Sequence, residues 1–258
     1  MENAPLSDTV CEGAGFTPVS IAAMDDTAAP ALGPATTGPA DAPHQADPAD
    51  RPIGPQRVIS VHFPKAAGSS LKSQFEALLG DQVFLDYGHD PLVVADRQAV
   101  AFPDGKRLVH GHFHPSRYGL MEAYWLTFLR DPVDNLLSIY FYWIDLPEPG
   151  HRVHARFLRE RPSVLEFAAY PGISTLMSET YFGGVDMRRF DFIGFHETRA
   201  ADLGRLGADT GLSLAAETHV NRTADTAERQ EMKADPALRC RIADLLAADM
   251  TFYDRLRR

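Results

Sequence analysis

The chain has 258 residues, 45% of them hydrophobic and 23% charged, a composition that suits one globular domain and excludes collagen-like and wholly disordered proteins. The formal net charge of −10 is unevenly placed, because residues 1–52 hold eight acidic residues and only one basic residue. The rest of the chain is therefore close to neutral, which disfavours a duplex nucleic-acid binder, since proteins of that class need a basic face.

Residues 1–52 are rich in Ala, Pro, Asp and Gly, and Phe16 is their single aromatic residue. Such a segment buries too little apolar surface to offset its ordering entropy, so it predicts a disordered leader, with a partner-binding tail as the alternative. Its start lacks the basic and apolar parts of a secretory signal, and no run in the chain approaches the ~18 apolar residues of a membrane span. We therefore expect a cytoplasmic protein whose folded domain covers residues 53–258.

The segment 57–63 is a short apolar, β-branched run that predicts a buried strand, and Leu71, Phe75 and Leu79 recur after it at helical spacing. Further strands are predicted over 82–87, 107–113, 124–130 and 189–195. Helices are predicted from Asp131, a cap followed by Pro132, and over 153–160 and 162–170, with a glycine-bearing loop at 180–184. A final long helix would bury Leu245, Leu246, Met250 and Tyr253.

Strands that alternate with helices predict an α/β fold, a three-layer sandwich whose central sheet is mainly parallel. Its first strand, loop and helix would form a P-loop-like unit for binding an anionic group. In such sheets, ligands bind at the carboxyl ends of the strands. Functional residues are therefore expected directly after strands, and three polar segments lie there.

The first polar segment, HFPKAAGSSL, joins the first strand to the first helix, so the helix N-terminus would face any bound anion. Lys65 adds a cation, Gly68 removes a Cβ, and the first helical turn adds two hydroxyls. The loop would thus bind an anion through Lys65, Ala66, Ala67, Gly68, Ser69 and Ser70. The plainer alternative is an ordinary turn with a serine cap. The segment does not fit the nucleotide motif GxxxxGK[ST], because its lysine precedes its glycine.

The second segment, WLTFLRDPVDNLLSIY, places Arg130 at a strand end and Ser138 eight residues later, two turns into a helix. An arginine fork suits a phosphate, and Ser138 shares a helix face with Asp131 and Asn135. Both Arg130 and Ser138 could reach one phosphoryl group. The alternative is an arginine paired with a nearby acid and a serine without a role.

The third segment, LVHGHFH, places His110, His112 and His114 on one side of a strand, if the strand extends that far. Three such histidines could bind zinc, but the chain has no HExxH motif, and alternate histidines in strands are commonly buried hydrogen-bonding groups. Cys11 and Cys240 match neither a disulfide framework nor a zinc-binding spacing, and both are expected to be reduced.

Together, the first two segments resemble the 5′-phosphosulfate and 3′-phosphate motifs of sulfotransferases that use 3′-phosphoadenosine 5′-phosphosulfate (PAPS). The His-Gly-His resembles the carbohydrate branch of that family, which includes the uronyl 2-O-sulfotransferases, and the missing membrane anchor resembles soluble bacterial-type members. Weaker similarities to the same branch extend over the segments FDFIGFHETRAADLGRL, HVNRT and DMTFYDRL.

The resemblance implies that PAPS is the sulfate donor, that an acceptor hydroxyl on a carbohydrate or glycoconjugate is the second substrate, and that no metal is required. It assigns His112 as the catalytic base, with His110 supporting it, and Lys65 as the stabiliser of charge on the leaving phosphate. Residues 65–70 would hold the 5′ side of the donor, and Arg130 and Ser138 would hold its 3′-phosphate.

Two further features concern substrates. The adenine could stack on an aromatic side chain, for which the candidates are Tyr142, Trp143, Tyr181 and Phe182. Arg152, Arg156 and Arg159 lie at helical spacing and could bind an acidic glycan, or form an ordinary solvated face. Two other functions stay open: a P-loop-type kinase or NTPase in which Asp131 binds the metal, and a non-catalytic nucleotide- or glycan-binding module.

Overall fold

The computed structural model describes residues 56–66, 68–88, 98–119, 121–147, 152–215 and 226–258. The expected leader over residues 1–52, with Cys11, lies outside these residues, as do Ala67 and the HVNRT segment. The folded domain predicted over 53–258 contains all of the described residues.

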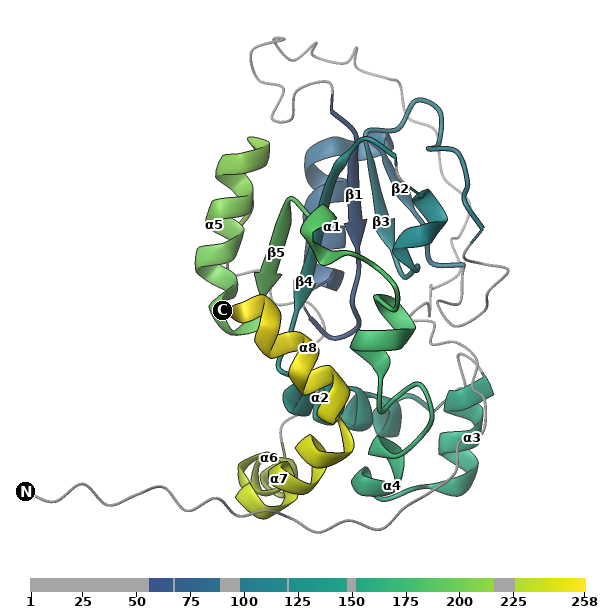
Figure 1. Ribbon diagram of the computed structural model, residues 1–258, viewed down its shortest axis with the longest axis vertical. Coiled ribbons are helices and arrows are strands. Elements are labelled where there is room, and N and C mark those ends of the chain that lie inside the picture. Colours follow the sequence, from purple (N-terminus) through teal and green to yellow (C-terminus); the bar gives the residue numbers. More distant parts are fainter. Residues whose placement is uncertain (1–55, 67, 89–97, 120, 148–151, 216–225) are drawn as a thin grey trace, which may run out of the picture.

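A parallel sheet forms the centre of the fold (Figure 1). Its strands are β1 (Val58–Val61), β2 (Val83–Leu85), β3 (Leu108–Gly111), β4 (Tyr124–Leu129) and β5 (Phe192–Phe195), in the spatial order β2-β3-β1-β4-β5. Every pairing is parallel, and all four residues of β1 are buried. These are the five strands that the sequence predicts.

Helices pack against this sheet and against one another. The helix α1 (Gly68–Leu79) lies behind the sheet in Figure 1, and α5 (Arg199–Thr210) packs beside β5. The carboxyl ends of the strands point toward a second group of helices: α2 (Pro132–Asp145), α3 (Arg152–Glu160), α4 (Val164–Ala168), α6 (Ala227–Ala234) and α7 (Pro236–Leu245). The predicted α/β fold class is confirmed. None of the described helices is long and apolar enough to span a membrane.

The two predicted helix starts are set by local chemistry. The Asp131 carboxylate accepts a hydrogen bond from the Asp134 amide at 3.0 Å, and Pro132 occupies the first helical position of α2, as expected. Ser163 and Glu166 form a reciprocal capping box at the start of α4.

Two elements differ from the sequence prediction. The single last helix is in fact α7 and α8 (Ala247–Arg257), which separate at Leu246, where φ is −100° and ψ is 21°. Leu246 and Tyr253 are buried as predicted, but the break leaves Leu245 40% exposed. The predicted loop at 180–184 begins inside η5 (Leu176–Tyr181), a π-helix, which composition does not distinguish from a loop.

Candidate active site

The first two polar segments meet because they follow adjacent strands, β1 and β4. Three side chains of the second segment donate hydrogen bonds to carbonyl oxygens that end β1 or belong to the loop after it. The bonds are Thr127 Oγ1 to Val61 O at 2.9 Å, Asn135 Nδ2 to Pro64 O at 2.7 Å, and Arg130 Nη1 to Lys65 O at 3.2 Å. With its carbonyls held from the β4 side, the first loop has a fixed backbone.

Arg130 has a donor that no group among the described residues uses. Its Nε is buried and has no hydrogen-bond partner there, while Nη1 contacts the Lys65 carbonyl. Burial lowers the pKa of this guanidinium, although Asp134, Glu197 and Asp131 oppose that effect. Since a buried N–H without an acceptor is costly, an oxyanion at this point would improve the local hydrogen bonding.

Lys65 adopts an unusual backbone conformation with φ at 56°. The left-handed region costs a residue with a Cβ roughly 1–2 kcal/mol, so the bonds to neighbouring carbonyls must hold the loop in this shape. The Lys65 ammonium lies 4.1 Å from the centroid of the Tyr142 ring, an aromatic side chain of α2 that is half-buried. A cation therefore lies between the first loop and the helix that begins after Arg130.

Gly68 begins α1, and its lack of a side chain is required by the packing. A Cβ added there would lie 1.7 Å from His62 Cδ2, far inside van der Waals contact. In the same helical turn, Ser70 Oγ accepts hydrogen bonds from Arg199 Nη2 at 2.6 Å and from Gln74 Nε2 at 3.3 Å. In both of these bonds Ser70 Oγ is the acceptor, so they do not use the hydrogen of the Ser70 hydroxyl.

The other predicted anion-binding residues lie nearby. Ala66 is buried in the loop and Ser69 is half-buried in the first turn of α1. Ser138 is half-buried in α2, three residues beyond Asn135, and so lies on the helix face that contacts the first loop. Its side chain makes no hydrogen bond with the described residues.

His112 and His110 differ in how their ring nitrogens are used. His110 is fully buried, with Nδ1 2.8 Å from Ser60 Oγ and Nε2 3.2 Å from the Gly68 carbonyl. Since a carbonyl only accepts, Nε2 carries the hydrogen and Nδ1 accepts from the serine. Burial lowers the pKa of His110 to about 3, so this ring stays neutral.

His112 has the opposite tautomer. Its Nδ1 lies 2.7 Å from the His62 carbonyl and 3.1 Å from the Tyr181 hydroxyl. Donation from Nδ1 to the carbonyl fixes the hydrogen there, so the lone pair that can accept a proton is on Nε2. The His62 carbonyl, in the first polar segment, thus determines the tautomer of His112 in the third.

His62 is a further candidate site residue, which the sequence patterns did not indicate. Its ring stacks on His112 with a centroid separation of 4.1 Å and on His110 at 5.1 Å, and its Nδ1 lies 2.8 Å from the Tyr87 hydroxyl. Burial first, and then its histidine and lysine neighbours, lower the pKa of His62 well below its ordinary value. The β1–β3 register places it, because Ser60 pairs with His110 and Val61 with Gly111, and the next residues along the two segments are His62 and His112.

His114 lies outside this stack. The strand β3 ends at Gly111, and His114 instead caps a short 3-10 helix, η4 (Pro115–Tyr118), with Nδ1 2.7 Å from Ser116 Oγ. Its Nε2 lies 3.0 Å from the Gly183 carbonyl. His114 is therefore a buried hydrogen-bonding group, which is the alternative to zinc binding that the sequence leaves open. The described residues contain no group of three or more His, Cys, Asp or Glu side chains suited to a metal ion. Cys240 is exposed and forms no disulfide with another described residue.

Among the candidate aromatic residues for adenine stacking, Trp143, Tyr181 and Phe182 are buried in the core and Tyr142 is half-buried.

The basic face of α3 is partly neutralised within the helix. Arg156 Nε lies 2.8 Å from Glu160 Oε2, and Arg159 Nη2 lies 3.4 Å from Glu160 Oε1. Arg152 is exposed.

No protein-family model matches the chain, and no curated protein matches it. Among solved structures, the chain is similar to the mouse sulfotransferase SULT7A1 complexed with PAP, with 14% identity and a TM-score of 0.34 over 77% of this chain and 66% of the mouse protein. It is also similar to a sulfotransferase from Alicyclobacillus acidocaldarius, with 13% identity and a TM-score of 0.39 over 77% of this chain and 97% of that protein.

Proposed function

We propose that this protein is a sulfotransferase that moves a sulfuryl group from PAPS to an acceptor hydroxyl. The observation that carries the proposal is the arrangement of two anion-binding segments at the ends of neighbouring strands. Arg130 joins them through the Lys65 carbonyl and keeps its buried Nε–H available for an oxyanion. A nucleotide with phosphate groups on both sides of its ribose suits such a paired site.

Each segment has a distinct role in donor binding. The amides at the start of α1, with Ser69 and Ser70, would hold the phosphosulfate, and Lys65 would stabilise charge that develops on the leaving phosphate oxygen. Arg130 and Ser138 would bind the 3′-phosphate, which distinguishes PAPS from ATP. Tyr142 is our candidate for contact with the adenine, because it is the least buried of the four aromatic residues.

The transfer step uses His112 as the base. The acceptor oxygen forms a new S–O bond while the bond between sulfur and the 5′-phosphate oxygen breaks, and His112 Nε2 takes the acceptor proton. The products are a sulfate ester and adenosine 3′,5′-bisphosphate. Nothing in this balance requires a metal ion, and positioned proton transfer of this kind contributes roughly 10²–10⁴-fold to the rate. His110, whose two nitrogens contact Ser60 and Gly68, would position the loop rather than contact substrate.

For the acceptor, we propose a carbohydrate or glycoconjugate hydroxyl, on the basis of the His-Gly-His resemblance. The glycine of this motif has a packing reason as well, because a Cβ at Gly111 would lie 1.8 Å from the Asp86 carbonyl oxygen. Recognition of an acidic glycan by α3 has less support, because two of the three arginines already contact Glu160.

Titration calorimetry with adenosine 3′,5′-bisphosphate and with ADP tests the donor class. Selective binding of the bisphosphate is expected, without any requirement for Mg²⁺. Tight Mg²⁺-dependent binding of ADP with no response to the bisphosphate would instead support the kinase or NTPase alternative. In the structure, the Asp131 carboxylate already caps α2.

Substitution of His112 tests the base. Transfer of labelled sulfate from PAPS to a panel of monosaccharides, uronic acid oligosaccharides and 4-nitrophenol should fall by at least 10²-fold in His112→Ala, with bisphosphate affinity retained. The control is His154→Gln, which changes a buried histidine in α3 that contacts the Trp143 carbonyl. Unchanged transfer in His112→Ala would remove His112 as the base. Donor binding without transfer to any acceptor, in the unaltered protein, would favour a non-catalytic module.

A further inference from the structure

The helix α8 buries an unusual set of side chains. Its buried residues are Asp249, Phe252 and Tyr253, so a carboxylate and a phenol account for two of the three. Asp249 and Tyr253 are four residues apart and therefore lie on the same face of the helix. Each contacts a different part of the candidate site.

Asp249 holds the first turn of η5. Its carboxylate accepts hydrogen bonds from the Met177 amide at 2.8 Å, the Ser178 amide at 2.8 Å and the Ser178 hydroxyl at 2.6 Å. These bonds satisfy amides that a helix start leaves without internal partners. The other end of η5 is Tyr181, whose hydroxyl lies 3.1 Å from His112 Nδ1.

The packing of α8 supports the same connection. The Phe252 ring stacks on Phe182, the residue directly after Tyr181, with centroids 6.0 Å apart and planes 12° from parallel. Since Tyr181 is itself buried, its hydroxyl has little freedom to move unless η5 moves. The position of α8 therefore determines where this hydroxyl meets His112.

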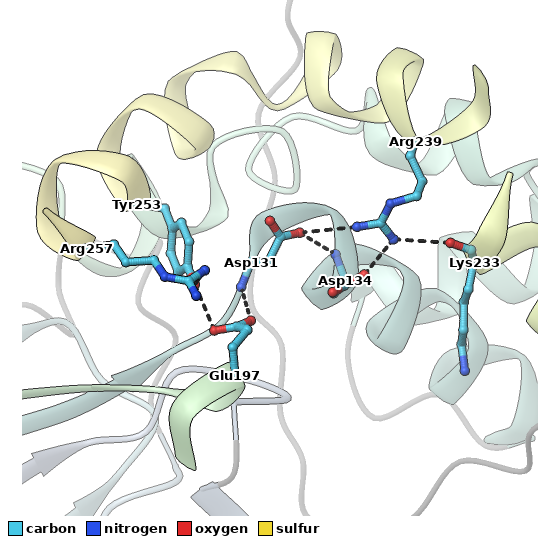
Figure 2. Close-up of polar contacts among 7 residues, drawn as sticks. All are labelled: Asp131, Asp134, Glu197, Lys233, Arg239, Tyr253 and Arg257. Carbon is cyan, nitrogen blue, oxygen red and sulfur yellow. Dashed lines mark hydrogen bonds and ion pairs between the residues drawn. The ribbon is translucent and has the colours of Figure 1, made fainter. Parts of the chain in front are cut away.

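Tyr253 is connected to the part of the candidate site that contains Arg130. Its hydroxyl donates to Glu197 Oε2 at 2.7 Å, and Glu197 Oε1 accepts from the Asp131 amide at 2.8 Å (Figure 2). Asp131 directly follows Arg130. Burial and the bond to Glu197 raise the pKa of Tyr253, so its hydroxyl keeps the proton that it donates.

Glu197 is exposed, yet both of its oxygens accept from the protein. The amide between Arg130 and Asp131 is thereby held by Glu197, which follows β5, and through Tyr253 it is connected to α8. On the far side, Arg239 of α7 donates to Asp134 Oδ1 at 2.6 Å and approaches Asp131 Oδ1 at 3.8 Å (Figure 2). The segment that follows Arg130 is thus contacted from both sides, at its backbone by Glu197 and at its carboxylates by Arg239, which restricts the direction in which the Arg130 side chain leaves the sheet.

We propose that α8 positions both halves of the active site: Tyr253, through Glu197, sets the Arg130 anion pocket, and Asp249, through η5, sets Tyr181 against His112. This inference rests on the proposed function. Neither Tyr253 nor Asp249 contacts a substrate, so both are positioning residues. Removal of either contact should then impair one half of the site and spare the other.

Two measurements separate these effects without a known acceptor. The first is calorimetric affinity for adenosine 3′,5′-bisphosphate, and the second is the imidazole nitrogen NMR signal of His112. Tyr253→Phe should weaken bisphosphate binding about fivefold and leave the His112 signal in place. Asp249→Asn should move the His112 signal in the same direction as Tyr181→Phe does, with bisphosphate affinity within about twofold of the unaltered protein.

A control variant and two alternative variants test whether these effects are specific to the two connections. Thr251→Ala, an exposed position of α8 between the two residues, should change neither readout. Glu197→Gln tests the Arg130 connection and Ser178→Ala tests the η5 connection if the α8 variants do not fold. Unaltered affinity in Tyr253→Phe and Glu197→Gln, or parallel changes of both readouts in every variant, would overturn the inference. If the unaltered protein does not bind the bisphosphate at all, the proposed function itself fails.

Discussion

Substitution of Arg130 by methionine should separate donor binding from protein stability. The change keeps an unbranched apolar stem and removes the guanidinium, whose Nε is buried without a partner among the described residues and whose Nη1 contacts the Lys65 carbonyl. A 3′-phosphate on such a fork would receive two charge-assisted hydrogen bonds of about 1.5 kcal/mol each. Their loss amounts to about 3 kcal/mol, or roughly a 10²-fold increase in the Kd for adenosine 3′,5′-bisphosphate.

The stability of the free protein should behave differently. Burial of the cation is already unfavourable, as the lowered pKa of Arg130 shows. Replacement of a poorly compensated buried charge by an apolar group is often neutral or stabilising. We therefore expect the free energy of unfolding of Arg130→Met to stay within about 1 kcal/mol of the original, or to rise.

Calorimetry with two nucleotides and urea denaturation check this expectation. Adenosine 5′-monophosphate, which has no 3′-phosphate, should bind the variant and the unaltered protein equally. The reasoning would be refuted if both nucleotides lost affinity to the same extent, because Arg130 would then not read the 3′ side. It would also be refuted if bisphosphate affinity were retained while stability fell.

Two further predictions concern packing and pH. Gly68→Ala places a Cβ 1.7 Å from His62 Cδ2, so the loop must move. We expect urea denaturation to show a free energy of unfolding lower by about 1–3 kcal/mol, together with weakened bisphosphate binding. An unaffected variant would mean that this contact is not present in solution. Burial raises the pKa of Asp249 from 3.8 to about 6, so between these values the folded state binds the proton more tightly than the unfolded state does. The free energy of unfolding of the unaltered protein, measured relative to that of Asp249→Asn by denaturation at each pH, should therefore increase by up to about 3 kcal/mol as the pH falls from 7 to 3.5. An increase of this difference as the pH rises would contradict the buried environment assigned to Asp249.

The sheet and the start of α2 were predictable because their signals are local. Apolar β-branched runs bounded by proline predict buried strands, and the Asp131-Pro132 pair supplies the chemistry of a helix start. Lys65 and Arg130 could be predicted as candidate site residues because each follows a strand in a parallel sheet, where ligand-binding loops meet.

Other parts of the site depend on contacts that sequence patterns do not contain. His62 joins the histidine stack only through the register of β1 and β3, and the tautomer of His112 depends on the backbone carbonyl of His62 in the loop after β1. The break at Leu246 was also hidden, because residues on both sides of it follow one helical pattern. Asp249 lies three residues beyond that break and holds η5, a contact that the predicted continuous helix did not indicate.

The bond from Arg130 to the Lys65 carbonyl joins groups 65 positions apart in sequence, yet the two strands that carry them are neighbours at the middle of the sheet. A ligand that contacts both loops therefore stabilises the pairing of β1 with β4, because it binds the folded chain and finds no equivalent surface on the unfolded chain. Bound nucleotide should slow amide hydrogen exchange most in β1 and β4, including on their far ends from the loops, because opening that ladder would require the ligand to leave first. For the donor site proposed here, nucleotide binding and the stability of the β1–β4 pairing are therefore thermodynamically linked.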